Sequence, residues 1–598
     1  MKRRDFLLRA GLGLAGGAWF PRLGKAAEQP FQPLEKNTGQ RPNVILILTD
    51  DQGHGDMGFN HNPKIHTPNL DRLARESVRF ERFHVNPVCS PTRASLMTGR
   101  YYYRTGVVDT YLGRSMMFPD EVTVAQMLAA ADYRTGIFGK WHLGDNYPMR
   151  AMDKGFQESL VLNGGGLAQP GDAPFEVHPD GAYFDPWLRH NGAWVRGKGY
   201  ITDVLTDAAL EFIGKPSPQP FFIYLPYNAP HSPLQVPEKY LTRYLHADLK
   251  VPQTGGHPVK KFNQETTARV YAMVECIDEN IGRLLARLDQ LKLADNTIVM
   301  FLTDNGPQQP RYNSGMLDLK GNTHEGGVRV PFLVRWPGHL QAGHTVDRIA
   351  ANIDVLPTIL DLCQVKKPEQ VKVDGVSLVP LLQGEVGNWP DRTIYFQWHR
   401  GDAPELNRAC AALSPKYKLV QPQGAFETHE PVRPVFELYD YASDPLEMKN
   451  IAAENPEIVA RMRRDYEAWF KDVAGAQDYT VPPRIYLGAP QQREVLLTRQ
   501  DWRGQNANWS PTGIGCWFVD VRRAGDYEIT LRFAKTNVPA LAKFALGVVK
   551  FQQEVGAGAT SVVLPLLHLP QGPATLEAVL ENGSSHVGMQ YVEVKSMI

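Results

Sequence analysis

Two kinds of hydrophobic pattern alternate along the first half of the chain. Continuous apolar runs at Val44–Leu48, Phe221–Tyr227 and Thr297–Thr303 predict strands that are buried on both faces, as in a parallel sheet. Between these runs, apolar positions recur at helical spacing over Asn69–Phe80, Val122–Ala131, Asp203–Ile213 and Thr267–Leu291. The alternation predicts an α/β domain over residues 40–337, with a central sheet flanked by helices.

The pattern changes after Pro337. Asp354–Cys363 and Pro456–Phe470 have helical spacing, whereas the segments near Thr393–Trp398 and Val435–Tyr441 are strand-like. These mixed short elements predict a smaller α+β subdomain over residues 338–475, packed on the first domain.

The pattern of apolar and polar residues changes again after the proline-rich segment Val481-Pro482-Pro483. Residues 490–598 show no helical period, and turn signals separate the strand-like runs Cys516–Val521, Tyr527–Phe533, Ser561–Leu567, Ala574–Leu580 and Tyr591–Lys595. This spacing predicts an accessory β-sandwich. Its Trp502, Trp509 and Trp517 either stack on sugars or, as we favour, pack in the core.

The first 27 residues are typical of an export signal. Adjacent Arg3 and Arg4 precede a weakly apolar, glycine-rich run over Ala10–Phe20, a pattern that resembles a twin-arginine signal peptide. An ordinary Sec signal or a short anchor is the alternative. The run is too short and too interrupted by glycine to span a bilayer. We therefore expect a periplasmic or secreted bacterial protein without a membrane span.

Composition excludes some classes of function. The 598 residues are 43% hydrophobic and 21% charged, and 64 basic residues balance 64 acidic ones. These are globular values, and a net charge of zero gives no reason to expect a nucleic-acid partner. An anionic substrate would therefore need a local basic site.

The five cysteines are widely separated and show no C-x-x-C spacing: Cys89, Cys276, Cys363, Cys410 and Cys516. The spacing gives no indication of a zinc site or of a dense disulfide framework. A disulfide among the last four stays open.

Oxygen-bearing side chains directly follow two of the predicted buried strands. Asp50 and Asp51 come after the first, and Asp304 and Asn305 come after the run ending at Thr303. For one pair alone, a turn or a helix cap would be the simpler reading. Because the carboxyl ends of parallel strands share one edge of a sheet, the two pairs together predict a site for a hard cation, Ca²⁺ or Mg²⁺.

The segment Cys89-Ser90-Pro91-Thr92-Arg93 has the form of a helix start. A serine N-cap followed by proline at the first helical position would place residue 89 at a helix amino terminus, which favours an anion. Arg93, one turn further on, is expected to point back towards residue 89.

This pentapeptide, with Thr98-Gly99-Arg100 behind it, resembles the signature of type I, formylglycine-dependent sulfatases of the alkaline phosphatase-like superfamily. Three further elements resemble that family in its order: Gly139–Gly144, Asn228–Pro233 and Lys320–Pro331. The resemblance covers roughly residues 40–475. It implies an alkaline phosphatase-like fold with a mixed central sheet and a smaller α+β subdomain.

The resemblance also implies the chemistry. A maturation enzyme would oxidise Cys89 to Cα-formylglycine before folding, and a hydroxyl of the hydrated aldehyde would be the nucleophile. Asp50, Asp51, Asp304, Asn305 and modified residue 89 would hold the metal, Ca²⁺ in preference to Mg²⁺.

Further roles are implied for residues around the sulfate. Lys140 would bind a sulfate oxygen and the formylglycine, and Lys320 would bridge sulfate and leaving oxygen. His142 would be the base that lets sulfate depart, and His231 the general acid that protonates the leaving alcohol. His324 is expected to be structural or peripheral.

The sequence therefore predicts a sulfuric ester hydrolase acting on a sulfated carbohydrate or an aryl sulfate. A phosphonate or phosphodiester hydrolase of the same superfamily is one alternative. A non-catalytic glycan-binding protein is another, although a binder has no need of the elements around Cys89.

Overall fold

The structure is a computed structural model that describes residues 41–173, 178–251, 255–385, 387, 389–427, 431–583 and 585–598. The predicted export signal over residues 1–27 lies outside the described residues. Within the described residues, no helix combines the length and apolar character that a bilayer span requires.

A mixed sheet of eleven strands forms the centre of the first domain, in the order β10-β2-β9-β8-β1-β7-β3-β4-β5-β6, with β11 also on β2. Its middle strand β1 (Asn43–Thr49) lies between β7 (Phe221–Pro226) and β8 (Thr297–Thr303), parallel to both. All three strands are completely buried, as their continuous apolar runs predict. β9 (Arg329–Arg335) pairs antiparallel with β8, so the sheet is mixed.

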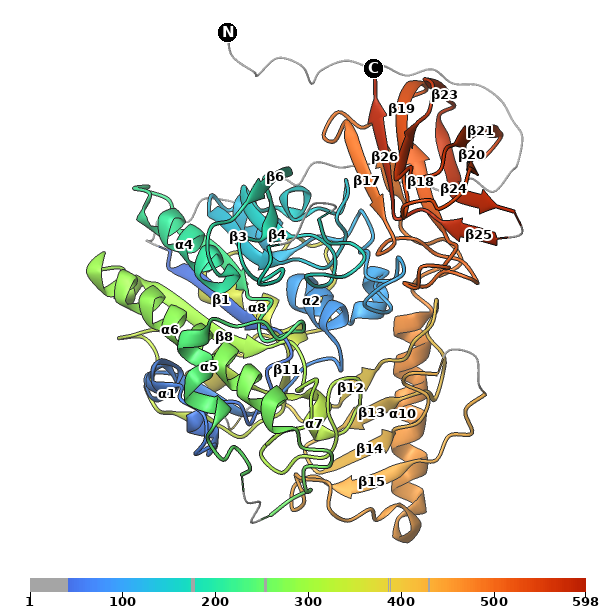
Figure 1. Cartoon of the computed structure of the whole chain (residues 1–598). Coiled ribbons are helices and arrows are strands. Elements are labelled where there is room, and N and C mark those ends of the chain that lie inside the picture. Colours follow the sequence, from blue (N-terminus) through green and yellow to red (C-terminus); the bar gives the residue numbers. More distant parts are fainter. Residues whose placement is uncertain are drawn as a thin grey trace, which may run out of the picture. The chain divides into compact units, whose positions relative to one another are not determined.

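The other strands of this sheet are β2 (Val78–His84), β3 (Arg134–Lys140), β4 (Glu158–Leu162), β5 (Trp187–His190), β6 (Ala193–Arg196), β10 (Thr345–Val346) and β11 (Ala350–Ala351). Its helices are α1 (Pro68–Arg75), α2 (Cys89–Thr98), α3 (Val124–Ala130), α4 (Ile201–Gly214), α5 (Glu238–Leu245), α6 (Gln264–Gln290), α7 (Glu325–Val328), α8 (Val355–Leu362) and α9 (Val379–Leu382). Ile45 and Ile47 of β1 share one hydrophobic cluster with α1, α4 and α6, which Figure 1 shows beside the sheet.

One predicted helix is too long. The helix expected over Asn69–Phe80 ends at Arg75, and β2 begins at Val78. From Val78 to Glu81, apolar and charged residues alternate, and Val78 and Phe80 are buried while their neighbours are partly exposed. This period of two is typical of a strand. It begins at Val78, three positions after the helix ends at Arg75.

The smaller subdomain is a four-stranded antiparallel sheet covered by one long helix. The strands are β12 (Ile394–Gln397), β13 (Cys410–Leu413), β14 (Tyr417–Gln421) and β15 (Glu437–Asp440). Helix α10 (Pro456–Ala474) packs Met462 and Tyr466 against Cys410 and Leu419 of this sheet. The α+β architecture is the one that the sequence predicts.

The last part of the chain forms two packed sheets. One contains β16 (Ile485–Leu487), β18 (Cys516–Val521), β24 (Gly572–Asn582), β20 (Ala540–Leu546), β21 (Val549–Val555) and β25 (Ser585–Gly588). The other contains β17 (Glu494–Thr498), β26 (Tyr591–Ser596), β19 (Gly525–Arg532), β22 (Ser561–Val563) and β23 (Leu567–Leu569). We propose 40–337, 338–475 and 490–598 as approximate bounds of the three parts. Two short strands of the second range, β10 and β11, pair with β2 of the first sheet, and β16 lies just before the third range.

Tryptophans of the module are core residues. Trp502 and Trp517 are completely buried in its hydrophobic cluster, and Trp509 packs edge-on against Tyr111. Trp502 and Trp517 therefore offer no ring to a sugar. All five cysteines of the chain are free thiols in the structure.

Candidate active site

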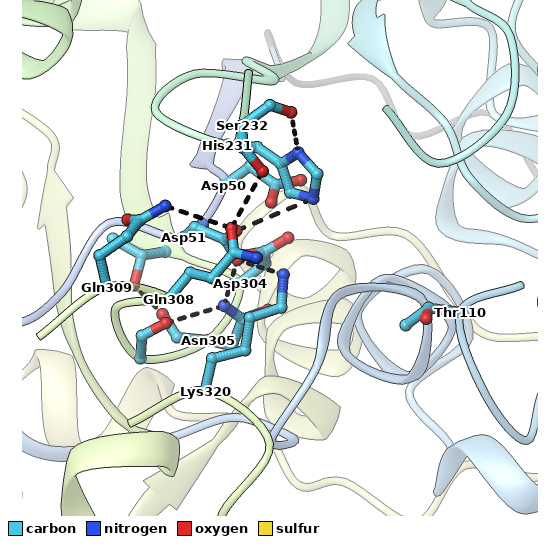
Figure 2. A network of polar contacts seen from close by, with 12 residues as sticks. Asp50, Asp51, Thr110, His231, Ser232, Asp304, Asn305, Gln308, Gln309 and Lys320 are labelled. Atoms are coloured by element: carbon cyan, nitrogen blue, oxygen red, sulfur yellow. Dashed lines mark hydrogen bonds and ion pairs between the residues drawn. The ribbon is translucent and has the colours of Figure 1, made fainter. Parts of the chain in front are cut away.

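Two pairs of oxygen-bearing side chains meet at the carboxyl ends of β1 and β8. Because the last residues of these strands pair in parallel register, Asp50 and Asp51 lie beside Asp304 and Asn305. The Asp51 N–H donates to Asp304 Oδ1 over 3.2 Å, and Asn305 Nδ2 donates to Asp51 Oδ1 over 2.8 Å. All four residues are completely buried, and Figure 2 shows them converging on one point.

Arg93 holds two of these carboxylates together. Its Nη2 donates to Asp50 Oδ2 over 2.8 Å and to Asp304 Oδ2 over 2.9 Å, while Nη1 donates to the Lys140 carbonyl over 2.8 Å. The sequence predicts that Arg93 points towards residue 89. Its hydrogen bonds go instead to two carboxylates and to the carbonyl at the end of β3. Arg93 therefore holds the carboxylates in their positions relative to β3.

Two lysines add positive charge at the same place. Lys140 Nζ lies 2.6 Å from Asp50 Oδ2, and Lys320 Nζ lies 2.5 Å from Asp51 Oδ1. Lys140, at the end of β3, is completely buried, and Lys320 is mostly buried. Three cationic side chains around these carboxylates give the site the means to bind an anion such as a sulfate ester group.

The remaining oxygen atoms fit a hard cation. Asp50 Oδ1, Asp51 Oδ2 and Asn305 Oδ1 are buried and have no hydrogen-bond partner among the described residues. Asp50, Asp51 and His231 offer ligand atoms that all lie within 4.8 Å of one another. Burial and the charge of Asp50 raise the pKa of Asp304 to about 7, and a bound cation would favour its ionised form. The donor set, mainly oxygen, is one that Ca²⁺ or Mg²⁺ accepts.

Cys89 is the first residue of α2, and Val88, not Ser90, occupies the N-cap position. Ser90 and Pro91 therefore lie inside the first turn, which corrects the predicted cap. The Ser90 hydroxyl donates to the His142 carbonyl over 3.1 Å and so ties the helix start to the segment after β3. Residue 89 still lies at a helix amino terminus, as predicted.

The encoded thiol of Cys89 is poorly suited to act as a nucleophile itself. Its side chain is buried, and burial raises the pKa of the thiol, although Lys140 and Lys320 act in the opposite direction. A raised pKa keeps the sulfur protonated and unreactive at neutral pH. The surroundings of residue 89 therefore do not favour a reactive thiolate.

Two buried histidines near the site bond to backbone carbonyls through opposite ring nitrogens. His142 Nε2 lies 2.7 Å from the Thr110 carbonyl, so Nε2 carries the proton and Nδ1 is left as a base. His231 Nδ1 lies 2.7 Å from the Ser232 carbonyl, which leaves Nε2 facing Asp51 Oδ2 at 3.8 Å. Burial lowers the pKa of both rings. His142, with φ of 61°, occupies the left-handed region, a strained conformation that is common at functional sites.

The loop that carries Lys320 is fixed by buried charges from the subdomain. Glu325 accepts from Lys418 Nζ over 2.7 Å, and His324 lies 2.9 Å from Glu437 Oε2. Lys418 and Glu325 are completely buried, and His324 is nearly so. His324 is thus structural, and it joins the Lys320 loop to β15.

Sequence reasoning missed one neighbour of the site altogether. Gln500, from the accessory module, donates Nε2–H to the Thr110 carbonyl over 2.9 Å and lies 3.5 Å from His142 Nε2. A glycine-rich segment closes the same region, since a Cβ at Gly165 would lie 2.5 Å from His142 Nε2 and one at Gly166 would lie 3.1 Å from His231. Gln500 and His142 are 358 positions apart, and no local pattern connects them.

Comparison with protein families gives two matches. The sulfatase family model matches residues 42–365, and the model for the C-terminal part of N-sulphoglucosamine sulphohydrolase matches residues 314–470.

Individual proteins are similar over the same region. Human N-acetylgalactosamine-6-sulfatase is 33% identical over 389 residues, which cover 61% of this chain and 69% of the human protein. Human arylsulfatase A is 31% identical over 487 residues, covering 71% of this chain and 86% of that protein. The crystal structure of Ps i-CgsB in complex with k-i-k-neocarrahexaose superposes with a TM-score of 0.62 at 29% identity, and the superposition covers 72% of this chain and 93% of that one.

Proposed function

Since the chain belongs to the sulfatase family, we propose that it hydrolyses sulfate esters with residue 89, converted to formylglycine, as the nucleophile. The hydrated aldehyde supplies the oxygen that attacks sulfur, and re-forming the aldehyde later releases sulfate. One observation carries the proposal. Four metal-ligand candidates, three cationic side chains and the helix start at Cys89 belong to one buried cluster. Three carboxylate or amide oxygens in it have no hydrogen-bond partner in the part of the chain that the structure describes.

The cations of the site would hold the sulfate group. Lys140 and Lys320 now contact Asp50 and Asp51, and a bound metal would take over those carboxylates and free the ammonium groups for sulfate oxygens. Arg93 remains bound to the ligand carboxylates and keeps them in place. Preorganised charges of this kind stabilise the transition state because they need no rearrangement during reaction.

The two histidines would divide the proton transfers. His231 has its Nδ1–H committed to Ser232, so its Nε2 would deliver the proton to the leaving alcohol, with Asp51 stabilising the charged ring. His142 Nδ1 has no hydrogen-bond partner among the described residues, and it would accept the proton from residue 89 that lets sulfate leave. Acid and base catalysis of this type is worth about 10²–10⁴ in rate each.

We propose Ca²⁺, in preference to Mg²⁺, as the metal. Mg²⁺ demands a near-ideal octahedron and keeps several waters, whereas Ca²⁺ accepts larger and less regular oxygen shells. The completely buried cluster of Asp50, Asp51, Asp304 and Asn305 suits the less regular oxygen shell of Ca²⁺ better. Elemental analysis of the purified protein, and reloading of chelated protein with each ion, would test the assignment.

We propose a sulfated carbohydrate as the substrate, with aryl sulfates as small surrogates. The similarity to N-acetylgalactosamine-6-sulfatase and to a structure solved with a neocarrahexaose supports this class. Sulfate release should be measured across defined sulfated mono- and disaccharides, and kcat/KM compared between a nitrophenyl sulfate and an aryl phosphate diester. A higher kcat/KM for the phosphate diester would favour the phosphodiesterase alternative.

We also propose that a maturation enzyme oxidises Cys89 in the cytoplasm and that the folded protein is exported by the twin-arginine route to the periplasm or beyond. The pair Arg3-Arg4 supports this route. Replacement of both arginines by lysine should retain the protein in the cytoplasm, and cell fractionation would show it.

A further inference from the structure

The accessory β-sandwich reaches the candidate active site through one loop between β17 and β18. Within this loop, the Gln500 carbonyl accepts from the Gly113 N–H over 2.7 Å, and Arg503 Nη2 donates to the Gly113 carbonyl over 2.8 Å. The side chain of Gln500 continues inwards and is 1% exposed. The module therefore does more than pack against the catalytic part, because one of its side chains reaches His142.

The chemistry of the contact fixes the orientation of the Gln500 amide. Its Nε2 lies 2.9 Å from the Thr110 carbonyl and 3.1 Å from Ser115 Oγ. A carbonyl can only accept, so the nitrogen of the amide, and not its oxygen, must face Thr110. Gln500 thereby uses one N–H on Thr110 and the other on Ser115.

The Thr110 carbonyl is also the acceptor for His142. The two donors converge on one oxygen, Gln500 Nε2 at 2.9 Å and His142 Nε2 at 2.7 Å, and they lie 3.5 Å apart. With its proton on Nε2 for the Thr110 carbonyl, His142 has Nδ1 as a lone-pair base. His142 Nδ1 is buried and has no partner among the residues that the structure describes.

The backbone around the ring leaves little freedom. A Cβ at Gly165 would lie 2.5 Å from His142 Nε2, and one at Gly171 would lie 2.7 Å from the Gln500 Cβ. The same glycine-rich segment thus lies against both the histidine and the glutamine.

We propose that Gln500 is a positioning residue for catalysis, which the accessory module supplies to set the tautomer of His142. The inference rests on the proposed function, in which His142 accepts a proton while sulfate leaves. The module would then act in the second step, the release of sulfate, and not in the first step, in which the alcohol departs.

A matched pair of variants tests the proposal. Gln500→Glu keeps the volume of the side chain but replaces the donor by an acceptor, which repels the Thr110 carbonyl. Gln492→Glu is the control, because Gln492 also donates from the module into the catalytic part, to Asn146 Oδ1 over 2.9 Å, at a place that does not touch Thr110. Both variants replace a donating side-chain amide by a carboxylate at the same interface.

Single-turnover experiments on a nitrophenyl sulfate separate the two steps, because alcohol and sulfate can be measured independently after quenching. For Gln500→Glu we expect unchanged release of nitrophenol and a slower release of sulfate, by roughly 5- to 100-fold, the usual effect of leaving a buried polar group unsatisfied. For Gln492→Glu we expect both rates to match the wild type. Nitrogen-15 chemical shifts of His142 in the resting enzyme, assigned with His142→Gln, should show the Nε2–H tautomer in wild type and Gln492→Glu and a mixture in Gln500→Glu.

Three outcomes would overturn the proposal: equal slowing of both steps in Gln500→Glu, the same slowing of sulfate release in Gln492→Glu, or an unchanged rate and tautomer in Gln500→Glu. The first two outcomes would mean that these glutamines only stabilise the interface between the module and the catalytic part. Failure of the proposed function itself would look different, because the wild-type protein would then release neither alcohol nor sulfate.

Discussion

His324 offers a quantitative test of how the Lys320 loop is held. Its Nδ1 lies 2.7 Å from Asp318 Oδ2 and its Nε2 lies 2.9 Å from Glu437 Oε2, so both ring nitrogens donate and the ring is an imidazolium. Burial opposes the charge, but the hydrogen bonds that the ring donates to Asp318 and Glu437 outweigh it and raise the pKa of His324 to about 9. An unfolded chain would give this ring a pKa of about 6.5.

The difference of about 2.5 pKa units corresponds to about 3 kcal/mol. Asp318 and Glu437 have side chains that are 39% and 26% exposed, so solvent screening reduces the expected contribution to about 2 kcal/mol. Since the pKa is raised on folding, the contribution is fully present below pH 6.5 and is lost as the pH rises through about 9. His324→Gln should therefore lower the free energy of unfolding by about 2 kcal/mol at pH 6 and by little at pH 10.

Urea unfolding of wild type and His324→Gln at pH 6, 7.5 and 10 measures this difference. His190→Gln is the control, because His190 also lies 2.6 Å from a carboxylate, that of Glu158, but its side chain is 47% exposed. An exposed pair of this kind contributes about 0–1 kcal/mol. If His324→Gln lowered the free energy of unfolding equally at pH 6 and pH 10, the charged ring between Asp318 and Glu437 would be refuted and His324 would have only a packing role.

Three further predictions concern the site itself. Cys89→Ala should abolish sulfate release and leave the circular dichroism spectrum unchanged, and full activity in protein whose intact mass shows only unmodified cysteine would disprove the mechanism. Asp304→Ala should lose the metal and most activity, because Arg93 and Asp51 lose their shared partner; undiminished metal content by elemental analysis would show that this strand end is only a turn. His231→Ala should slow hydrolysis of a sulfated sugar by about 10²–10⁴ but affect a nitrophenyl sulfate much less, because nitrophenolate departs without a proton. Equal losses on both substrates would reject the general-acid role.

The sequence predicted the parts of the fold in which local pattern and burial agree. β1, β7 and β8 read as continuous apolar runs because both faces of a central parallel strand are covered. The metal-ligand candidates could be found because Asp50 and Asp304 each follow such a strand.

Two features were not predictable from local pattern. The helix start at Cys89 lacks a side-chain cap, since Ser90 bonds to the His142 carbonyl, and a tertiary contact here outweighs the capping preference. Gln500 reaches the site only because two domains pack together, and a polar residue in a loop of a β-sandwich carries no sign of that contact.

The position of Gln500 has a consequence for the timing of biosynthesis. Its loop follows β17, which pairs with β26 at Tyr591–Ser596. That strand emerges from the ribosome about 500 residues after Cys89, which corresponds to roughly 25–100 seconds at typical rates of synthesis. Under the proposed mechanism, the cysteine is translated early and the strand that anchors the loop of Gln500 much later, so a nascent chain would have a waiting period in which residue 89 could be oxidised before His142 is oriented for turnover.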